Sequence, residues 1–521
     1  MNLDRTSPST VAMPPDSAKP SAPRVIWVLT AAMMLLTATW SLLTPQFLAP
    51  DESAHFASSV RLSEGFSWPD PATARFPASV EAAGEEARVP HSHRSTLSDL
   101  DRAHPGEGDR FDQMTQHPPL YYILTGGALA TPGVGELVWD QAMLSARLVG
   151  ALLAAPLVWL TWNTVTSLTK SSRMGTVAAF SIFAVPQLPQ TMGVVTNDSL
   201  AILAAWATTW LAVKILCGDR RWPQIVGLGV AFGFGCLVKG TVLPLGILLL
   251  LVLLLGAGGE KWSRRLAQTA VALAVAFVTG GWWWARNVLL FGTLQPDGLV
   301  QDPGAPPANG PSVGHYIDEV WSTTPTTFWG WFGRVNVPLP ELLVDVLTIS
   351  CALVVIVGTF RSRETLRSSA VLAAPVILAT VLFVRTSWVA YEDTGAVRGL
   401  HGRYFFPVLL AIVAIAAIAA ANIMVTRSAR RAFGHAVVGG AAALTITGLG
   451  VAFLGFYAGN AYGNWRVGLD VWLHSYSPVP SVVTLGVPFV ALASLALAIV
   501  MYLRSEWTAD VAHRRAPISR G

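Results

Sequence analysis

Apolar segments long enough to cross a lipid bilayer recur from one end of this 521-residue chain to the other. An α-helix rises about 1.5 Å per residue, so about 20 apolar residues cover roughly 30 Å of hydrocarbon. Only 13% of the residues are charged, whereas soluble domains contain about a quarter. We therefore expect an all-α polytopic membrane protein. The twelve expected spans are 25–45, 143–168, 174–194, 198–216, 223–238, 240–257, 266–290, 342–360, 368–385, 404–424, 434–457 and 483–503.

Short basic loops between these segments predict the topology. Together they contain 13 Lys or Arg and 3 Asp or Glu: TKSSR (169–173), DRR (219–221), EKWSRR (260–265), RSRETLR (361–367) and TRSARR (426–431). The positive-inside rule places such loops in the cytoplasm. With twelve spans all five fall there, and both termini are cytoplasmic. The long segments 46–141, 291–341, 386–403 and 458–482 are then extracytoplasmic.

The run LYYILTGGALAT (120–131) is too short to span and is expected to be an interfacial or half-inserted helix on the outer face. The Pro- and Ser-rich residues 1–24 predict a disordered cytoplasmic tail. The segment that follows is too long for a signal-peptide core and is expected to be a retained helix. We expect carboxyl-terminal transmembrane helices within 426–503 and a cytoplasmic tail over 504–521.

Charged residues are nearly absent from the interiors of the expected spans. Arg147, Lys239, Arg286, Asp345 and Arg385 lie near expected outer ends. An ion-coupled transporter is expected to place such residues near the bilayer midplane. The pattern therefore favours a reaction on a lipid-linked substrate at the outer surface. A transporter or flippase of lipid-linked saccharides and a non-catalytic membrane scaffold are the alternatives.

The stretch PDESAHF (50–56) directly follows the first expected span. If 51–64 is helical, Asp51 and His55 share a face while Glu52 points elsewhere. A carboxylate at the membrane surface could accept the proton of an attacking hydroxyl. Alternatively, a proline followed by acidic residues is a good helix start. Taken alone, the motif favours helix initiation.

QHPPLYY (116–122) combines His117 with two prolines and two tyrosines, Tyr121 and Tyr122. Functionally, this segment could fix a loop against the floor of an active site. Alternatively, its prolines start an interfacial helix whose tyrosines lie in the aromatic belt of the membrane. Taken alone, the motif favours the second interpretation.

VTNDSLA (195–201) places Asp198 in the expected outer turn between two spans. Its carboxylate could orient a substrate or bind a divalent cation such as Mg or Mn. Alternatively, Asn197 or Asp198 caps the next helix. The two roles are compatible, and the sequence leaves both open.

Basic and aromatic side chains are also expected on the outer face, among them Lys239, Arg286, Arg334, His401, Arg403 and Tyr404. Cations that converge on one point could hold a phosphate or pyrophosphate leaving group. For any single one, snorkelling beside aromatic anchors such as Trp282, Trp283 and Trp284 is the simpler interpretation. Their number on one face weakens that simpler interpretation.

The order of these motifs resembles the amino-terminal half of the GT-C glycosyltransferase superfamily. There, an Asp-Glu pair after the first helix precedes a Lys/His-Pro-Pro-Leu-Tyr motif, an Ala-Arg-Leu helix (here SARLVGALLA, 145–154) and an Asp-containing turn. Four details are closer to one branch, the predicted membrane proteins of domain-of-unknown-function family 2142. They are Asp-Glu-x-Ala-His-Phe, Asn-Asp-Ser-Leu, Arg-Asn beside the tryptophans and Gly-Arg-Tyr-Phe-x-Pro.

The resemblance implies a GT-C-like catalytic module over 25–425. This module would transfer a hexosyl or pentosyl group from a polyprenyl-phosphate donor to an extracytoplasmic acceptor, which is a cell-envelope glycan, a lipid or a protein. Asp51 matches the catalytic base, with Glu52 beside it in the catalytic pair, and Asp198 matches the second acidic position, tied to metal or substrate binding. The other candidates for substrate binding are His55, His117, Tyr121, Tyr122, Lys239, Arg286, His401, Arg403 and Tyr404.

Two features depart from the superfamily pattern. The Pro-Pro motif begins with His117 rather than the frequent lysine, and the carboxyl-terminal third contains no large soluble domain. A single carboxylate without a covalent partner would act by one displacement, which predicts inversion at the anomeric carbon.

Three cysteines, Cys217, Cys236 and Cys351, lie in or beside apolar segments and indicate no disulfide framework.

Overall fold

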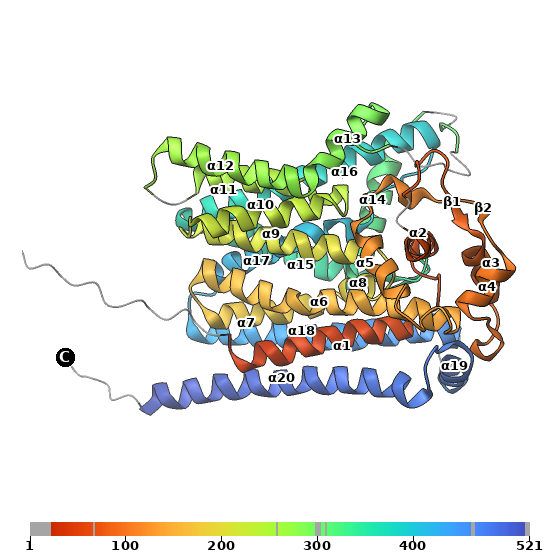
Figure 1. The fold of residues 1–521 in the computed structure, drawn as a ribbon. Helices are drawn as coiled ribbons and strands as arrows, with labels where there is room; N and C mark the ends of the chain where they lie inside the picture. Colours follow the sequence, from red (N-terminus) through yellow and green to blue (C-terminus); the bar gives the residue numbers. More distant parts are fainter. Residues whose placement is uncertain are drawn as a thin grey trace, which may run out of the picture.

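Long apolar helices run side by side through the molecule, as the hydropathy of the sequence predicts (Figure 1). The computed structural model describes residues 22–65, 68–256, 259–296, 304–307, 310–459 and 464–515, with side chains as far as 507. Among these residues, nine helical segments are long and apolar enough to cross a membrane. They are Arg24–Leu43, Trp139–Thr169, Asp198–Leu216, Trp262–Phe291, Glu341–Phe360, Arg363–Thr394, Gly402–Ile423, Arg427–Ala458 and Ser481–Trp507.

The remaining three expected spans take other forms. Trp222–Cys236 and Gly240–Leu255 are apolar but shorter helices. The segment expected to span over 174–194 is broken instead. Its first helix ends at Ser181, and Gln187–Met192 forms a separate short helix after Pro186. Proline lacks an amide hydrogen and disfavours helical conformation in the residue before it, which explains the break.

Among the described residues, the amino-terminal half contains ten α-helices, three short 3-10 helices and one pair of strands. Its elements are α1 (Arg24–Leu43), α2 (Glu52–Glu64), β1 (Arg75–Pro77), α3 (Ala78–Glu86), η1 (His91–His93), α4 (Leu97–Ala103), β2 (Glu107–Phe111), η2 (Gln113–Gln116), α5 (Leu120–Leu129), α6 (Trp139–Thr169), α7 (Ser172–Ser181), η3 (Ile182–Ala184), α8 (Gln187–Met192), α9 (Asp198–Leu216) and α10 (Trp222–Cys236).

The carboxyl-terminal half is built in the same way. Its elements are η4 (Gly240–Val242), α11 (Leu245–Leu255), α12 (Trp262–Ala276), the π-helix η5 (Phe277–Gly281), α13 (Trp282–Phe291), α14 (Val313–Trp329), β3 (Trp331–Phe332), β4 (Val337–Pro338), α15 (Glu341–Phe360), α16 (Arg363–Thr394), η6 (Gly402–Val408), α17 (Leu409–Ile423), α18 (Arg427–Phe453), η7 (Leu454–Ala458), α19 (Trp465–Val471), η9 (Trp472–Tyr476) and α20 (Ser481–Arg515).

The core of the bundle lies where α1 packs against α6 and α20, and where α6 packs against α7 and α9. Peripheral helices keep large apolar side chains on their outer surfaces, as Leu342 of α15 and Phe489 of α20 show with exposed fractions of 77% and 74%. An apolar belt of this kind would be costly in water, and lipid contact removes that cost. The predicted all-α polytopic membrane fold is therefore confirmed.

The long segment over 46–141, expected on the extracytoplasmic side, contains regular secondary structure. It contains α2 to α5, and β1 pairs antiparallel with β2, with Arg75 opposite Phe111. α5 has 10 residues, so its axis is about 15 Å long and too short to span. A cytoplasmic tail was expected over 504–521, whereas helix α20 continues to Arg515. Most of the expected tail 1–24 lies outside the described residues.

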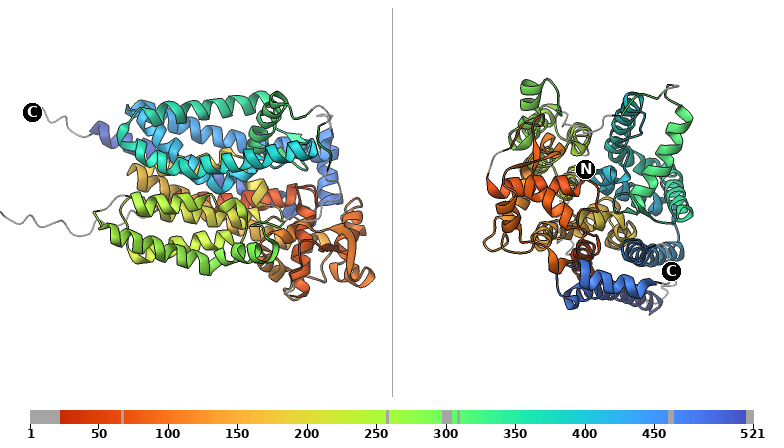
Figure 2. Two further views of the ribbon diagram at one scale, coloured as in Figure 1. Left: turned by 90° about the horizontal axis from the view of Figure 1, so that it is seen from above. Right: turned by 90° about the vertical axis from the view of Figure 1, so that its right-hand side faces the viewer.

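The two ends of the bundle differ. α1 begins and α20 ends at one end, whereas α2, α3, α4, β1, β2 and α19 gather at the other (Figure 1). In the end-on view of Figure 2, the orange elements of the first loop cover one side of this second end, and α19 lies along its lower edge. The polar motifs at the carboxyl end of α1, around α5 and at the start of α9 therefore meet at the same end.

Candidate active site

Asp51 begins helix α2 in an uncommon backbone conformation. Its φ and ψ are 61° and 5°, in the left-handed region that Asp tolerates better than most residues. The side chain does not cap the helix. Instead, Oδ2 accepts a hydrogen bond from Arg403 at 3.0 Å, and Oδ1 accepts one from Gln113 at 3.2 Å. A helix does begin at this motif, with Glu52 in its first turn, but the Asp51 side chain makes its contacts outside that helix.

A pocket of about 500 Å³ opens beside this carboxylate, of which 37% is exposed. Its walls come from the start of α2, from β1 and β2, from the turn between β3 and β4, and from η6. The lining side chains that carry polar or aromatic groups are Asp51, Ser53, Phe76, Arg110, Phe111, Gln113, Arg334, His401 and Arg403. Asp51 is therefore presented to the pocket and not to the helix bundle.

Glu52, the second acidic residue of the motif, points the other way and is fully buried. Its two carboxylate oxygens accept hydrogen bonds from Arg147 at 2.8 and 2.7 Å, and the amide of Val195 donates to the same carboxylate at 3.0 Å. Because these partners occupy it inside the protein, the geometry offers no support for the predicted catalytic role of Glu52. A positioning role fits its contacts.

Arg147 of α6 is the arginine of the Ala-Arg-Leu motif and was also noted near the outer end of an expected span. Besides the ion pair with Glu52, it donates to the carbonyls of Ser41 and Thr44 at 2.7 Å and of Pro45 at 3.1 Å. These carbonyls lie where α1 ends and lack helical partners. One buried guanidinium therefore ties together the end of α1, the start of α2 and, through Glu52, the segment before α9.

Asp198, at the first position of α9, forms a buried ion pair with Lys239 at 2.7 Å. Neither Asn197 nor Asp198 caps the helix with its side chain. Lys239 lies 5.5 Å from the ring centre of Tyr404, and the guanidinium of Arg403 lies 5.4 Å from the same ring. The structure thus brings two predicted cations together on one aromatic side chain, next to both acidic candidates.

The QHPPLYY segment closes the base of the site. Tyr122 shares a hydrogen bond of 2.9 Å with His55, and Tyr121 accepts one of 2.9 Å from the amide of Thr196. Both tyrosines are fully buried, so they do not lie in an aromatic belt. The contacts match the alternative in which this motif fixes a loop under the site.

Several buried polar atoms of this cluster have no hydrogen-bond partner within the described part of the chain. They are His117 Nδ1, both side-chain atoms of Asn197, Asp198 Oδ2 and Arg403 Nε. Buried polar groups are nearly always satisfied, by protein, water or ligand, because leaving one unpaired costs about 1–3 kcal/mol. Buried polar atoms without hydrogen-bond partners, in a cluster of carboxylates and basic side chains, are expected at a site that binds a polar ligand.

The charges of the cluster set the protonation states of its members. Burial raises the pKa of Asp51, but the nearby Arg403 and Lys239 outweigh it and hold this pKa below its ordinary value of 3.8. Burial and the positive charge of Arg403 lower the pKa of His401 to about 4. At neutral pH the pocket therefore presents an ionised carboxylate and a neutral imidazole.

We expect acid to destabilise the protein between pH 6.5 and about 3. Burial, assisted by the charge of Lys239, lowers the pKa of His55 and His117 from 6.5 to about 3. Within this window the unfolded chain binds protons that the folded protein does not, so the free energy of unfolding falls as pH falls. Thermal melts between pH 7.5 and 4.5 should show a smaller decrease in melting temperature for His117→Asn than for wild type.

His93→Asn is the matched control because the side chain of His93 is exposed. It should lose as much stability on acidification as the wild-type protein. An acid-induced decrease that is the same in His117→Asn and in wild type would contradict the assignment of a buried neutral imidazole.

Arg286 is the predicted substrate-binding residue that the structure does not bring to this cluster. Its guanidinium lies 4.7 Å from the ring centre of Trp283 and donates to Asn287 at 3.1 Å. This arrangement matches the snorkelling alternative. Conversely, Gln113 and Arg110 line the pocket but were not singled out in the sequence, because they lie in a polar loop without a recognisable motif.

The divalent cation expected at Asp198 stays a prediction. Among the residues with described positions, no three His, Cys, Asp or Glu side chains come together as metal ligands. One oxygen of the Asp198 carboxylate accepts a hydrogen bond from the ammonium of Lys239, and the other has no partner within the described part of the chain.

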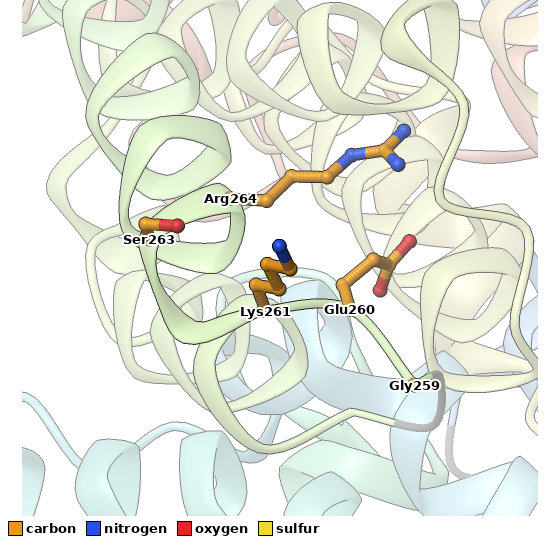
Figure 3. Close-up of a pocket in the computed structure, with 5 residues that line it drawn as sticks. All are labelled: Gly259, Glu260, Lys261, Ser263 and Arg264. Atoms are coloured by element: carbon orange, nitrogen blue, oxygen red, sulfur yellow. The ribbon is translucent and has the colours of Figure 1, made fainter.

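A second hollow, of about 460 Å³, lies at the opposite end of the bundle between α11 and α12. Figure 3 shows Lys261, Arg264 and Glu260 around it. These residues belong to one of the basic loops expected in the cytoplasm. None of the predicted site residues lines this hollow.

A family model described as predicted membrane protein (DUF2142) matches residues 34–412. The chain belongs to the DUF2142 family. No curated protein matches it.

Among solved structures, this DUF2142 protein is similar to ArnT from Cupriavidus metallidurans in the apo state. The TM-score is 0.50 at 17% identity, over 92% of this chain and 74% of that chain. For the structure of the same ArnT bound to undecaprenyl phosphate, the TM-score is 0.49 at 17% identity, over 91% of this chain and 75% of that chain. For the apo oligosaccharyltransferase from Archaeoglobus fulgidus, the TM-score is 0.42 at 12% identity, over 88% of this chain and 57% of that chain. The likeness to ArnT confirms the predicted GT-C-like fold.

Proposed function

We propose that this DUF2142 protein is a membrane glycosyltransferase of the GT-C type, which transfers a sugar from a polyprenyl-phosphate donor to a hydroxyl group of an acceptor. The single observation that carries the proposal is Asp51. It is a carboxylate held in a left-handed backbone conformation, open to a pocket and flanked by buried cations. Uncommon backbone conformations persist where surrounding contacts enforce them, and they cluster at active sites.

Asp51 would act as the general base. An acceptor hydroxyl in the pocket would attack the anomeric carbon of the donor sugar while its proton passes to Asp51. The new glycosidic bond forms as the bond between the anomeric carbon and the phosphate oxygen breaks, so the products are the glycosylated acceptor and polyprenyl phosphate. Since one carboxylate acts in a single displacement, we expect inversion of the anomeric configuration.

Lys239 and Arg403 would stabilise the leaving phosphate. Both are buried, both contact Tyr404, and each is paired with a carboxylate that keeps it in place. A preorganised cation in a poorly solvated site stabilises developing negative charge far more than it would in water. Their charges would take the part that a divalent ion plays in other phosphate-transfer sites.

The lipid donor and the orientation complete the proposal. ArnT, whose apo structure shares the fold, has also been solved with undecaprenyl phosphate, which supports a polyprenyl-phosphate donor. The positive-inside rule supports cytoplasmic termini and an extracytoplasmic pocket, because the basic loops lie at the end of the bundle opposite Asp51. A cell-envelope glycan, lipid or protein on that side would supply the hydroxyl.

The test is donor turnover by the purified full-length protein. We expect at least one member of a panel of radiolabelled polyprenyl-phosphate sugars to release polyprenyl phosphate in the presence of a cell-envelope extract. Treatment with EDTA should leave the rate within about twofold of the untreated rate, because Lys239 and Arg403 supply the positive charge. Turnover of no donor in the panel would contradict the proposed activity, and a rate abolished by EDTA and restored by Mg or Mn would contradict the metal-free mechanism.

A further inference from the structure

Two arginines on the outer wall of the pocket have no role in the chemistry described above. Arg110 lies on β2, and Arg334 lies in the turn between β3 and β4. Both side chains are exposed, and both line the same pocket as Asp51. The first loop and the segment before α15 are far apart in the sequence, so the fold alone brings these two cations to one opening.

Each arginine is held in place by contacts other than an ion pair, and the carboxylate of Glu81 accepts a hydrogen bond of 2.6 Å from the backbone amide of Arg110. Arg334 donates through Nε to the carbonyl of Phe47 at 3.0 Å, and the guanidinium of Arg110 lies 4.6 Å from the ring centre of Phe76. Across the described residues, neither arginine has a carboxylate within ion-pair distance. Their remaining N–H groups are therefore available to an anion.

The turn that carries Arg334 is itself strained. Gly333 and Val335, on either side of the arginine, have φ values of 66° and 61°. A β-branched residue in the left-handed region is a true outlier, whereas glycine adopts this region without strain. The turn is closed by a hydrogen bond of 3.2 Å from the amide of Asn336 to the carbonyl of Phe332. The chain thus accepts strain at Val335, next to a side chain that lines the pocket.

Charge in the pocket is unbalanced. Three guanidinium groups, from Arg110, Arg334 and Arg403, face one carboxylate, Asp51, while His401 is neutral. An excess of two positive charges in a partly enclosed pocket raises the local concentration of anions. Guanidinium groups also match phosphate and carboxylate geometry with paired N–H donors.

We propose that the acceptor is anionic, and that Arg110 and Arg334 together bind a phosphate or carboxylate group on it. This inference rests on the proposed glycosyltransferase function, because it names the substrate class of the same pocket. The donor phosphate is assigned to Lys239 and Arg403, which lie at or beside the ends of membrane helices. Arg110 and Arg334 lie beyond those ends, where an acceptor enters from water.

The test measures binding and does not require transfer. Full-length protein in nanodiscs is titrated with a fluorescent trisaccharide that carries one phosphate, and with the same trisaccharide without it, while fluorescence anisotropy is recorded. We expect the phosphorylated probe to bind at least about tenfold more tightly at low salt, and this preference to shrink as salt screens the charges. In Arg110→Gln/Arg334→Gln the preference should disappear, while affinity for the neutral probe stays the same.

Two matched variants separate charge from general damage. Arg102→Gln removes an exposed arginine of the same loop that pairs only with Asp99, and should bind both probes like wild type. Arg110→Lys/Arg334→Lys keeps the charge and should retain part of the preference. Equal affinity for the two probes in wild type, or a preference that persists in the double Gln variant, would overturn the inference.

A competition with polyprenyl phosphate distinguishes the two possible sources of the anion. We expect the double Gln variant to bind polyprenyl phosphate as wild type does, since its phosphate sits elsewhere. If the variant loses that affinity, the arginines hold the donor and the inference fails. In the wild-type protein, donor turnover without any preference for the phosphorylated probe refutes only the anionic acceptor, whereas a clear preference without turnover of any donor refutes only the enzyme.

Discussion

Asp51→Asn is expected to slow sugar transfer by about 10²- to 10⁴-fold while the protein stays folded. General-base catalysis contributes a factor of this size, and an amide cannot accept the proton of the attacking hydroxyl. The substitution keeps the shape of the side chain and one oxygen that can accept the hydrogen bond from Arg403. Initial rates with a radiolabelled donor, measured beside a thermal melt of each preparation, give both quantities.

Asp109→Asn is the control for this experiment, because it removes an exposed acidic side chain from the same loop, outside the pocket lining. It should retain the wild-type rate. Affinity for polyprenyl phosphate should not fall in Asp51→Asn, since the substitution removes a negative charge paired with Arg403 and leaves both phosphate-binding cations in place. Full transfer activity in a well-folded Asp51→Asn protein would remove Asp51 from the mechanism.

Arg147→Met is expected to cause the largest loss of stability of any single substitution discussed. Removing one partner of a buried ion pair typically costs about 3–5 kcal/mol, because the other charge is left uncompensated. Here the substitution leaves Glu52 without its ion-pair partner and removes the guanidinium donor from the carbonyls of Ser41 and Thr44. The carbonyl of Pro45 also loses this donor but keeps the amide of Leu48 at 3.2 Å. A strongly lowered melting temperature in detergent, or failure to accumulate as folded protein, is the expected result.

Two further variants show whether the ion pair is the cause. Replacing both partners, as Glu52→Gln/Arg147→Met, should recover part of the lost stability, because no charge is then stranded. Arg173→Met breaks a more exposed pair with Glu506 and should cost less than about 1 kcal/mol. If Arg147→Met melts within a degree or two of wild type, the buried pair does not hold α1, α2 and the start of α9 together.

The stability effect also bears on activity. Asp51 precedes Glu52 in the chain, so the pair with Arg147 fixes the helix start on which Asp51 stands. Of the two acidic residues of this motif, one faces the pocket and the other anchors the backbone that presents it. We therefore assign chemistry to the first and positioning to the second.

Hydropathy and motif order were enough to predict the all-α polytopic fold, the family and the helix over 51–64. They succeed because the bilayer imposes a length and an apolar composition on each span, whatever it packs against. The segment 174–194, expected as one span, is divided into separate helices at Pro186.

The sequence could not decide which way neighbouring polar side chains point. Helix geometry predicted that Asp51 and Glu52 point in different directions, but only the tertiary structure shows that Asp51 faces the pocket and Glu52 pairs with Arg147. Nor could the sequence show that Arg110 and Arg334 line the same pocket. Contacts between distant segments depend on how the helices pack, and no local pattern of residues encodes that packing.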